Sequence, residues 1–257
     1  MIYNYHTHTE RCGHAHGGDE EFINRAIEAG IKYLGFSDHM PMIFPDGYES
    51  SYRVPMSEAE SYVSDLRKLR EKHRNKIEIS IGFEMEYYPL YFDEMLNIAR
   101  NCGAEYLLLA QHFIGGERPN GKGSIGPTDS EEHLKCYVDE VIAGMKTGVF
   151  TYVAHPDLVC FTGDEEIYKR EITRLCKASK ECGVPLEINM LGIRCKKHYP
   201  ADKFWQIAGE IGAPVTIGFD AHKSKNLLDK DQLVIAKKII NTYKLNYIGM
   251  PKLRMIN

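Results

Sequence analysis

The chain has 257 residues, of which 43% are hydrophobic and 26% are charged, and its formal net charge is -4. These values are typical of a globular protein and exclude a disordered, a collagen-like or a disulfide-stapled small chain. No run of five like charges occurs, so the sequence lacks the basic stripe that holds a long nucleic acid. We therefore expect no nucleic-acid partner, and an anionic substrate would need positive charge supplied locally.

The N-terminal segment has neither the basic start nor the apolar stretch of a secretory signal, and no later stretch approaches the roughly 20 apolar residues of a membrane span. We expect a cytoplasmic protein without a membrane partner. The seven cysteines contain no Cys-x-x-Cys pair. They predict reduced thiols rather than a disulfide framework or a zinc ribbon.

A glycine followed by a short apolar run recurs five times and is the clearest signal of organisation. The glycines are Gly30, Gly103, Gly148, Gly183 and Gly212. Glycine suits the left-handed position that ends a helix, and a short apolar run is typical of a strand buried on both faces. The repeated unit is therefore a helix, a tight turn and a parallel strand.

Seven strands are predicted, at 2–5, 33–36, 77–82, 106–109, 152–154, 186–188 and 215–217. Helices are predicted between them, among others at 57–73, 130–147, 165–182 and 227–240. Two of these helices would start with a capping box, formed by Ser57 with Glu60 and by Thr162 with Glu165. The alternation predicts one α/β domain over residues 1–257 with a parallel sheet, either open and doubly wound or closed into a barrel.

Metal-capable side chains follow nearly every predicted strand; only the sixth strand has none. They are His6, His8, Asp38, His39, Glu84, His112, His155, Asp220 and His222. In a barrel all strand ends meet at one face, so these residues would converge, whereas an open sheet would spread them out. Imidazole and carboxylate ligands suit zinc, manganese and iron. The pattern favours a barrel with a cluster of divalent metal ions.

The segment from Gly121 to Gly126 spells G-x-G-x-x-G but begins about ten residues after its strand and is followed by Pro127. A dinucleotide site needs a tight turn from strand to helix, so this motif is set aside. We expect residues 115–128 to form a flexible loop over the barrel mouth. Lys122 or Arg118 could attract phosphate from it.

The ordered motifs His6-Thr7-His8-Thr9, Ser37-Asp38-His39, Gly82-Phe83-Glu84, Gln111-His112, Ala154-His155-Pro156-Asp157 and Asp220-Ala221-His222 resemble those of the polymerase and histidinol phosphatase family. Among its members, the histidinol-phosphatases are the most similar. The resemblance runs from residue 5 to residue 222. It implies a distorted, amidohydrolase-like (β/α)7 barrel with three divalent metal ions. It also implies hydrolysis of L-histidinol phosphate to L-histidinol and phosphate, a late step of histidine biosynthesis.

The resemblance also implies a distribution of ligands over three metal ions (zinc, manganese or iron). His6 and His8 would bind the first ion with Glu84 and Asp220, and Glu84 would bridge to a second ion. His112 and His155 would complete that second site, and a third ion would take His14, His39 and His222. The spacing from His8 favours His14 over His16. Asp38 is expected to orient His39 or to cap the following turn.

Substrate contacts are expected from the loop after the sixth strand. Arg194 would face the metal cluster with a guanidinium that suits phosphate oxygens, unless it is an ordinary surface arginine. His198 and Tyr199 would contact the substrate or protonate its leaving group, or else simply pack the loop. Asp157 or Glu117 would bind the imidazole and the amino group of the substrate.

The expected mechanism uses metal-bound hydroxide as the nucleophile, with Asp220 orienting it or accepting its proton. Two other functions remain open. The nearer is a phosphoesterase of the same family that acts on a nucleotide or a sugar phosphate, and a substrate panel would distinguish it. The more distant is a metal-binding or interaction module without activity.

Overall fold

The computed structural model describes residues 1–117 and 121–256. Within these residues, eight strands form one sheet in the order β1-β2-β3-β4-β7-β8-β9-β10. Their bounds are β1 (Tyr3–Asn4), β2 (Tyr33–His39), β3 (Glu78–Met85), β4 (Tyr106–Leu109), β7 (Phe150–Val153), β8 (Leu186–Asn189), β9 (Pro214–Gly218) and β10 (Asn246–Tyr247). Every neighbouring pair is parallel. The predicted α/β fold and its seven strands are confirmed, while β10 was not predicted because its two residues are exposed and carry no apolar run.

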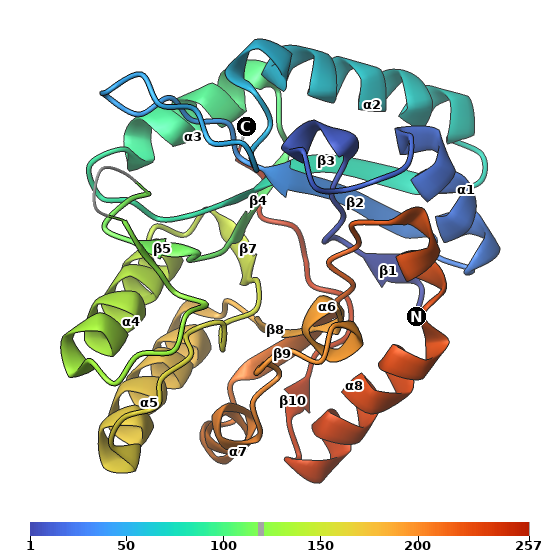
Figure 1. The fold of residues 1–257 in the computed structure, drawn as a ribbon. Helices are drawn as coiled ribbons and strands as arrows, with labels where there is room; N and C mark the ends of the chain where they lie inside the picture. The colour runs from blue at the N-terminus through green and yellow to red at the C-terminus, as the bar shows by residue number, and fades with distance from the viewer. Residues whose placement is uncertain (118–120, 257) are drawn as a thin grey trace.

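Helices connect the strands and lie around the outside of the sheet (Figure 1). Their bounds are α1 (Asp19–Glu28), α2 (Ala59–His73), α3 (Phe92–Cys102), α4 (Glu131–Lys146), α5 (Glu165–Cys182), α6 (Met190–Arg194), α7 (Asp202–Ile211) and α8 (Lys230–Thr242). Short 3₁₀ turns are η1 (Glu10–Cys12), η2 (Met56–Glu58) and η3 (Ser224–Leu228). Among the described residues, no helix has both the length and the apolar character that crossing a bilayer requires.

The five glycines that were predicted to end helices all have positive φ angles. These are 77° at Gly30, 81° at Gly103, 79° at Gly148, 60° at Gly183 and 70° at Gly212. Other residues rarely adopt this conformation, so glycine is the natural residue where a helix turns directly into a strand. The repeated helix–turn–strand unit is therefore confirmed.

Both predicted capping boxes are wrong. Ser57 lies inside η2, and α2 begins after Glu58 without a side-chain cap. The cap of α5 is Asp164, whose carboxylate accepts hydrogen bonds from the backbone of Glu166 and Ile167. Asp164 directly precedes the helix and is itself a preferred N-cap residue, so it occupies the position that the motif assigned to Thr162.

Side chains alternate between two apolar environments along the strands. Leu107 and Leu109 of β4 belong to the main core, which also contains the buried faces of the helices. The intervening Tyr106 and Leu108 belong to a smaller cluster with Tyr3, Tyr5 and Tyr152 on the other face of the sheet. The strands are thus buried on both faces, as expected for a parallel sheet with crossover helices.

Hydrogen bonds join the segments that follow β1 and β9. The backbone N–H of His8 donates to Ala221 O at 3.0 Å, and the N–H of Ala221 donates to His6 O at 3.2 Å. The Oδ1 atom of Asn4 accepts a hydrogen bond from the N–H of Phe219 at 2.9 Å. These contacts place the residues after β1 directly beside the residues after β9.

Residues 115–128, predicted to form a loop, contain one short strand where they are described. Within them, β6 (Lys122–Gly123) pairs with β5 (Phe113–Ile114) in an antiparallel hairpin. Further on, the N–H of Ser124 donates to His112 O at 2.8 Å. The glycine-rich motif is thus part of a hairpin and not a strand-to-helix turn, as its position indicated. Arg118 lies outside the described residues.

Candidate metal centre

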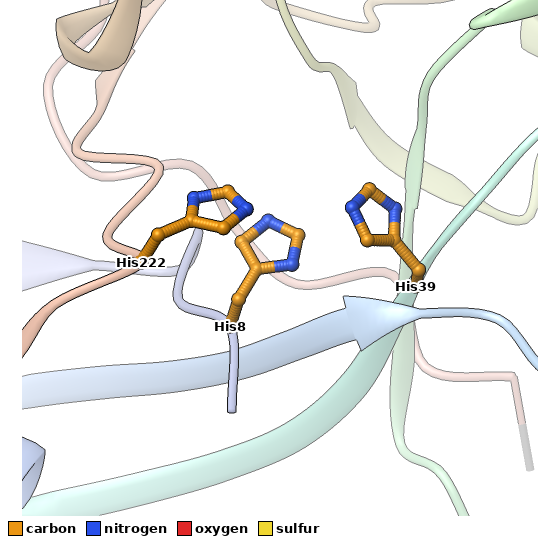
Figure 2. A group of neighbouring side chains, drawn as sticks. All are labelled: His8, His39 and His222. Atoms are coloured by element: carbon orange, nitrogen blue, oxygen red, sulfur yellow. The ribbon is translucent and has the colours of Figure 1, made fainter. Parts of the chain in front are cut away.

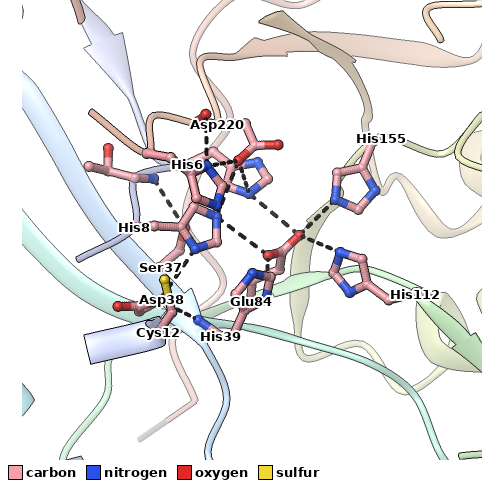
Figure 3. A network of polar contacts seen from close by, with 12 residues as sticks. His6, His8, Cys12, Ser37, Asp38, His39, Glu84, His112, His155 and Asp220 are labelled. Atoms are coloured by element: carbon pink, nitrogen blue, oxygen red, sulfur yellow. Dashed lines mark hydrogen bonds and ion pairs between the residues drawn. The ribbon is translucent and has the colours of Figure 1, made fainter. Parts of the chain in front are cut away.

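The structure brings the metal-capable side chains from the strand ends together into one buried cluster (Figure 3). The cluster collects His6 and His8 after β1, His39 at the end of β2, Glu84 in β3, His112 after β4, His155 after β7, and Asp220 and His222 after β9. Parallel strands point their carboxyl ends the same way, which is why residues so distant in sequence meet here.

Glu84 lies at the centre of the cluster, with histidines on both sides of its carboxylate (Figure 3). Its Oε1 atom is 2.8 Å from His155 Nε2 and 3.8 Å from His112 Nε2. The same oxygen is 3.4 Å from His6 Nε2, and Oε2 is 3.5 Å from His8 Nε2. A carboxylate in this position can bridge two metal ions, with one oxygen bound to each.

Asp220 provides a second carboxylate on the β1–β9 side of the cluster. Its Oδ1 atom is 3.2 Å from His8 Nε2, 3.6 Å from His6 Nε2 and 3.1 Å from His222 Nδ1. Its Oδ2 atom accepts a hydrogen bond from Asn189 Nδ2 at 3.0 Å, which fixes the carboxylate plane. One oxygen therefore faces the imidazoles while the other is held by the protein.

A further group of imidazoles lies at the outer side of the cluster. Figure 2 shows His8, His39 and His222 converging, and these three side chains satisfy the geometry of a metal-binding group. The ring of His14 reaches the same place, with its Nε2 atom 3.0 Å from His222 Nε2. The exposed His16 instead takes part in a backbone bridge with Lys223. The structure thus brings His14, and not His16, to the cluster.

The donor atoms of the cluster fit a bound divalent metal. Several buried polar atoms here make ion-pair contacts within the cluster at most, and no hydrogen bond, among the described residues: His6 Nε2, His8 Nε2, His39 Nδ1, Glu84 Oε2, His155 Nδ1 and Asp220 Oδ1. Leaving such atoms unsatisfied costs about 1–3 kcal/mol each. Divalent ions satisfy nitrogen and carboxylate donors together, and the residues form several groups with metal-binding spacing.

The protonation states of the cluster follow from burial and from its own charges. Burial alone would lower the pKa values of His6 and His8, but the carboxylates beside them raise both well above the usual value, so metal binding displaces protons from these two rings. Burial alone would raise the pKa values of Glu84 and Asp220, but His6 and the neighbouring imidazoles hold both pKa values well below their usual range. Burial lowers the pKa of His39 to about 3, so its ring is neutral at physiological pH. Ionised carboxylates and neutral imidazoles are the forms that bind metal.

Three of the histidines have a carboxylate at the ring nitrogen that faces away from the cluster. Glu187 Oε1 lies 2.8 Å from His6 Nδ1, and Glu86 Oε1 lies 2.8 Å from His112 Nδ1. Asp38 was expected to orient His39, but its Oδ1 atom lies 3.3 Å from His8 Nδ1 and touches His39 only at the backbone. Such carboxylates fix which nitrogen faces a metal.

Glu187 and Glu86 were not predicted from the sequence, although the sequence pattern around each of them contains a signal. Glu187 is the one charged residue in the apolar run of β8, and it is fully buried. Glu86 stands two residues after Glu84, the spacing that places alternate strand residues on the same face. Burial of a carboxylate inside a strand requires a partner, and that requirement was the available signal.

Two residues of the cluster have unusual backbone conformations, with φ angles of 30° at His155 and 47° at Asp220. Non-glycine residues in this region store strain, which accumulates at functional sites.

Arg194 holds the backbone of Asp220, because its Nη2 atom donates to Asp220 O at 3.0 Å. Its Nη1 atom donates to Asp229 at 2.8 Å. The structure therefore directs this guanidinium to the Asp220 loop and not to the pocket expected from the sequence.

A pocket of about 610 Å³ opens above the cluster. Its wall consists of aromatic, aliphatic and a few polar side chains, among them Tyr52, Phe113, Ile125, Leu158, Leu191, Cys195, Lys197 and Tyr199. Within residues 1–117 and 121–256, Lys197 is the one lysine or arginine that lines it. The loop after β8 thus reaches the pocket through other residues than Arg194.

Of the remaining predicted substrate contacts, Asp157, His198 and Glu117 are not among the residues that line the pocket. Asp157 is buried and its Oδ2 atom accepts a hydrogen bond from the N–H of Ala201 at 2.7 Å. His198 Nε2 lies 2.8 Å from Leu158 O. Glu117 accepts a hydrogen bond from Arg53 Nε at 3.1 Å. Of this group only Tyr199 lines the pocket, with its ring 6.1 Å from that of His155.

Some known proteins of similar sequence are described as histidinol-phosphatases, and others only as probable phosphatases. A probable histidinol-phosphatase of Deinococcus radiodurans is 25% identical over 226 residues, which cover 85% of this chain and 85% of the relative. A probable histidinol-phosphatase of Schizosaccharomyces pombe is 23% identical over 242 residues, covering 84% of this chain and 79% of the relative.

Solved structures share the fold. The crystal structure of histidinol phosphate phosphatase from Lactococcus lactis, in complex with zinc, L-histidinol and phosphate, superposes with a TM-score of 0.72. The two chains are 19% identical, and the match covers 96% of this chain and 95% of the other. A family model, the PHP domain, matches residues 4–190. This match covers most of the chain and contains most of the cluster, so the chain belongs to the PHP domain family.

Proposed function

We propose that the chain is a metal-dependent phosphomonoesterase that hydrolyses L-histidinol phosphate to L-histidinol and phosphate. The observation that carries the proposal is the cluster of histidines around Glu84 and Asp220 at the floor of a pocket of about 610 Å³. The names of the similar proteins support the choice of substrate.

Three divalent ions, either zinc, manganese or iron, account for the donor groups. The first ion would be bound by His6, His8, Glu84 and Asp220, each of which has one buried polar atom without a hydrogen-bond partner among the described residues. The second would be bound by Glu84 with His112 and His155. The third would be bound by His14, His39 and His222, which lie on the outer side of the cluster.

The sheet that positions these ligands is proposed to close into a distorted barrel within a single domain over residues 1–257. The hydrogen bonds between the segments after β1 and β9 support closure at the carboxyl end of the strands. At the other end, the hydroxyl of Tyr3 donates to Gly249 O at 2.8 Å, beyond β10. Closure explains why His8 and Asp220 meet although β1 and β9 stand far apart in the strand order.

Bound divalent ions would supply a water of lowered pKa and would neutralise negative charge on the phosphoryl group. Asp220 is the residue placed to accept the proton of the attacking water, because Oδ1 faces the cluster while Oδ2 is held by Asn189. A hydrogen bond from that water to Oδ1 would also orient it for in-line attack on phosphorus.

Lys197 is proposed to bind the phosphate oxygens that point away from the metals. It lines the pocket, and an ammonium group pairs well with a phosphate dianion. Arg194, whose guanidinium holds the carbonyl oxygen of Asp220, is proposed to position that residue. It therefore contributes to catalysis through Asp220.

The organic half of the substrate is proposed to lie against the apolar wall. The rings of Tyr52 and Phe113 stack there, with centroids 6.0 Å apart and an interplanar angle of 17°. A flat imidazole ring packs well on such a surface, which also keeps bulk water from the reacting phosphate. Tyr199 closes the opposite side near His155.

The test is phosphate release from L-histidinol phosphate by metal-reconstituted protein, beside p-nitrophenyl phosphate and a panel of nucleotides and sugar phosphates. Metal content is determined on the same sample. We expect a large preference in kcat/KM for histidinol phosphate, with close to three ions per chain. Turnover of the other esters alone would contradict the substrate while leaving a metal-dependent phosphoesterase. Full activity after complete metal removal would contradict the mechanism.

A further inference from the structure

A second buried charge cluster lies behind the metal centre. Arg53, in the segment after β2, is 2% exposed, and Glu86, just after β3, is 1% exposed. The Nη1 atom of Arg53 donates to Glu86 Oε2 at 2.8 Å, and its Nε atom donates to Glu117 Oε2 at 3.1 Å. Its Nη1 atom also donates to Met40 O at 3.1 Å. One buried guanidinium thus joins segments after β2, β3 and β5.

This cluster contacts the metal centre at one point. Arg53 occupies the Oε2 atom of Glu86, so the Oε1 atom is left to face His112 Nδ1 at 2.8 Å. With the proton of His112 on Nδ1, the lone pair is on Nε2, which points towards Glu84 Oε1 at 3.8 Å. Burying an arginine and a carboxylate costs free energy because each loses its hydration, and close pairing with good hydrogen bonds is needed to offset that cost.

We propose that Glu86, clamped by Arg53, is the positioning residue for His112: it fixes the ring orientation and the tautomer with which His112 binds the second metal ion. The inference rests on the metal centre of the proposed function. Glu86 is not among the residues that line the pocket, and it acts through His112. Its counterparts are Glu187 at His6 and Asp38 at His8, but among the described residues only Glu86 of these three is paired with a buried arginine.

Arg53 also contacts a residue of the pocket wall. Arg53 lies over the ring of its neighbour Tyr52, with its guanidinium carbon 5.3 Å from the centroid. The Tyr52 ring meets the His39 ring edge-on, with the centroids 5.7 Å apart. Loss of the Arg53 side chain would therefore disturb the Tyr52 ring directly and His112 through Glu86.

The test measures metal affinity directly, with no substrate present. Glu86→Gln keeps the shape of the side chain but removes its charge, and Glu117→Gln removes the other carboxylate on Arg53 as a matched control. Stepwise titration of metal-free protein with Co²⁺, followed by its visible absorption and by calorimetry, reports each site in turn. We expect Glu86→Gln to lower the binding affinity for one of the ions by about 10–100-fold, which is the usual effect of losing a carboxylate behind a metal-bound histidine. The other ions and the Glu117→Gln titration should match those of the wild type.

Glu86→Gln could fail to fold because it leaves Arg53 with one carboxylate. In that event the double variant Arg53→Met with Glu86→Gln, which removes both members of the pair, replaces it in the same titration. Unchanged affinity at every site in a folded variant would overturn the proposal, even if the wild type hydrolyses histidinol phosphate. Conversely, a selective loss of one ion would uphold it even if the enzyme prefers a different phosphate ester.

Discussion

Glu187 Oε1 lies 2.8 Å from His6 Nδ1, and this contact joins residues 181 positions apart in the chain. Its other oxygen accepts hydrogen bonds from the N–H of His155 at 3.0 Å and from Asn189 Nδ2 at 2.9 Å. Room for this carboxylate depends on Gly218 in the adjacent strand, because a methyl group there would overlap Glu187 Oε1. The sixth predicted strand supplies no candidate ligand itself, but its Glu187 holds two of the candidate ligands, His6 and His155.

Replacement of Glu187 by Gln is expected to reduce metal affinity by about 10–100-fold, because a neutral amide orients His6 less firmly than a carboxylate does. The measurement is metal content at a series of buffered free-metal concentrations. A matched control is Glu171→Gln on α5, a buried glutamate paired with Arg170 and Arg174 away from the cluster. Equal metal retention in the two variants would argue against an orienting role for Glu187.

Lys197→Ala and Arg194→Ala should differ in their kinetics. Loss of Lys197 removes a charged contact with phosphate, worth about 1.5–3 kcal/mol, and is expected to raise KM by at least about tenfold with metal content unchanged. Loss of Arg194 releases the carbonyl oxygen of Asp220 and should lower kcat and metal retention together. Steady-state kinetics with metal analysis separate these patterns, and the reverse assignment would restore Arg194 as the phosphate ligand.

His14→Ala should cost activity that added metal partly restores, because His14 is proposed to hold the outer ion with His39 and His222. His16→Ala is the matched control, since His16 is exposed and lies only two residues away. Activity is measured against free metal concentration for both variants. Full activity of His14→Ala at limiting metal would indicate a centre with only two required ions.

Glu140 on α4 should make stability depend on pH. Burial raises the pKa of its carboxyl to about 7, although it accepts hydrogen bonds from Gly115 N and Gln111 Nε2. The folded state then holds a proton that the unfolded state releases near pH 4.5, so this group lowers stability as pH rises from about 4.5 to 7.

The Glu140→Gln variant loses this titration. The Tm of the variant minus the Tm of the wild type should therefore increase from pH 5 to pH 8. Thermal unfolding of both proteins across that range, at constant ionic strength, is the measurement. A Tm difference that does not change with pH would show that Glu140 titrates with an ordinary pKa.

The local features of the fold could be predicted from the sequence. Gly30 and its four counterparts end helices because only glycine takes the required φ angle without strain, and this is a property of single residues. The apolar runs of β4 and β7 identify buried strands for a similarly local reason. Residues at the ends of parallel strands meet by topology, so the candidate ligands from His6 to His222 could also be named in advance.

Tertiary structure alone decided which polar groups face one another. Arg194 could reach the pocket from its place in the sequence, but Asp229 and the Asp220 carbonyl lie closer and engage its guanidinium. Lys197, three residues later, lines the pocket instead. The pairing of Glu86 with both Arg53 and His112 likewise depends on segments from different strands. Such long-range contacts are set by how the elements pack, because a buried charge takes whatever partner the fold brings within reach.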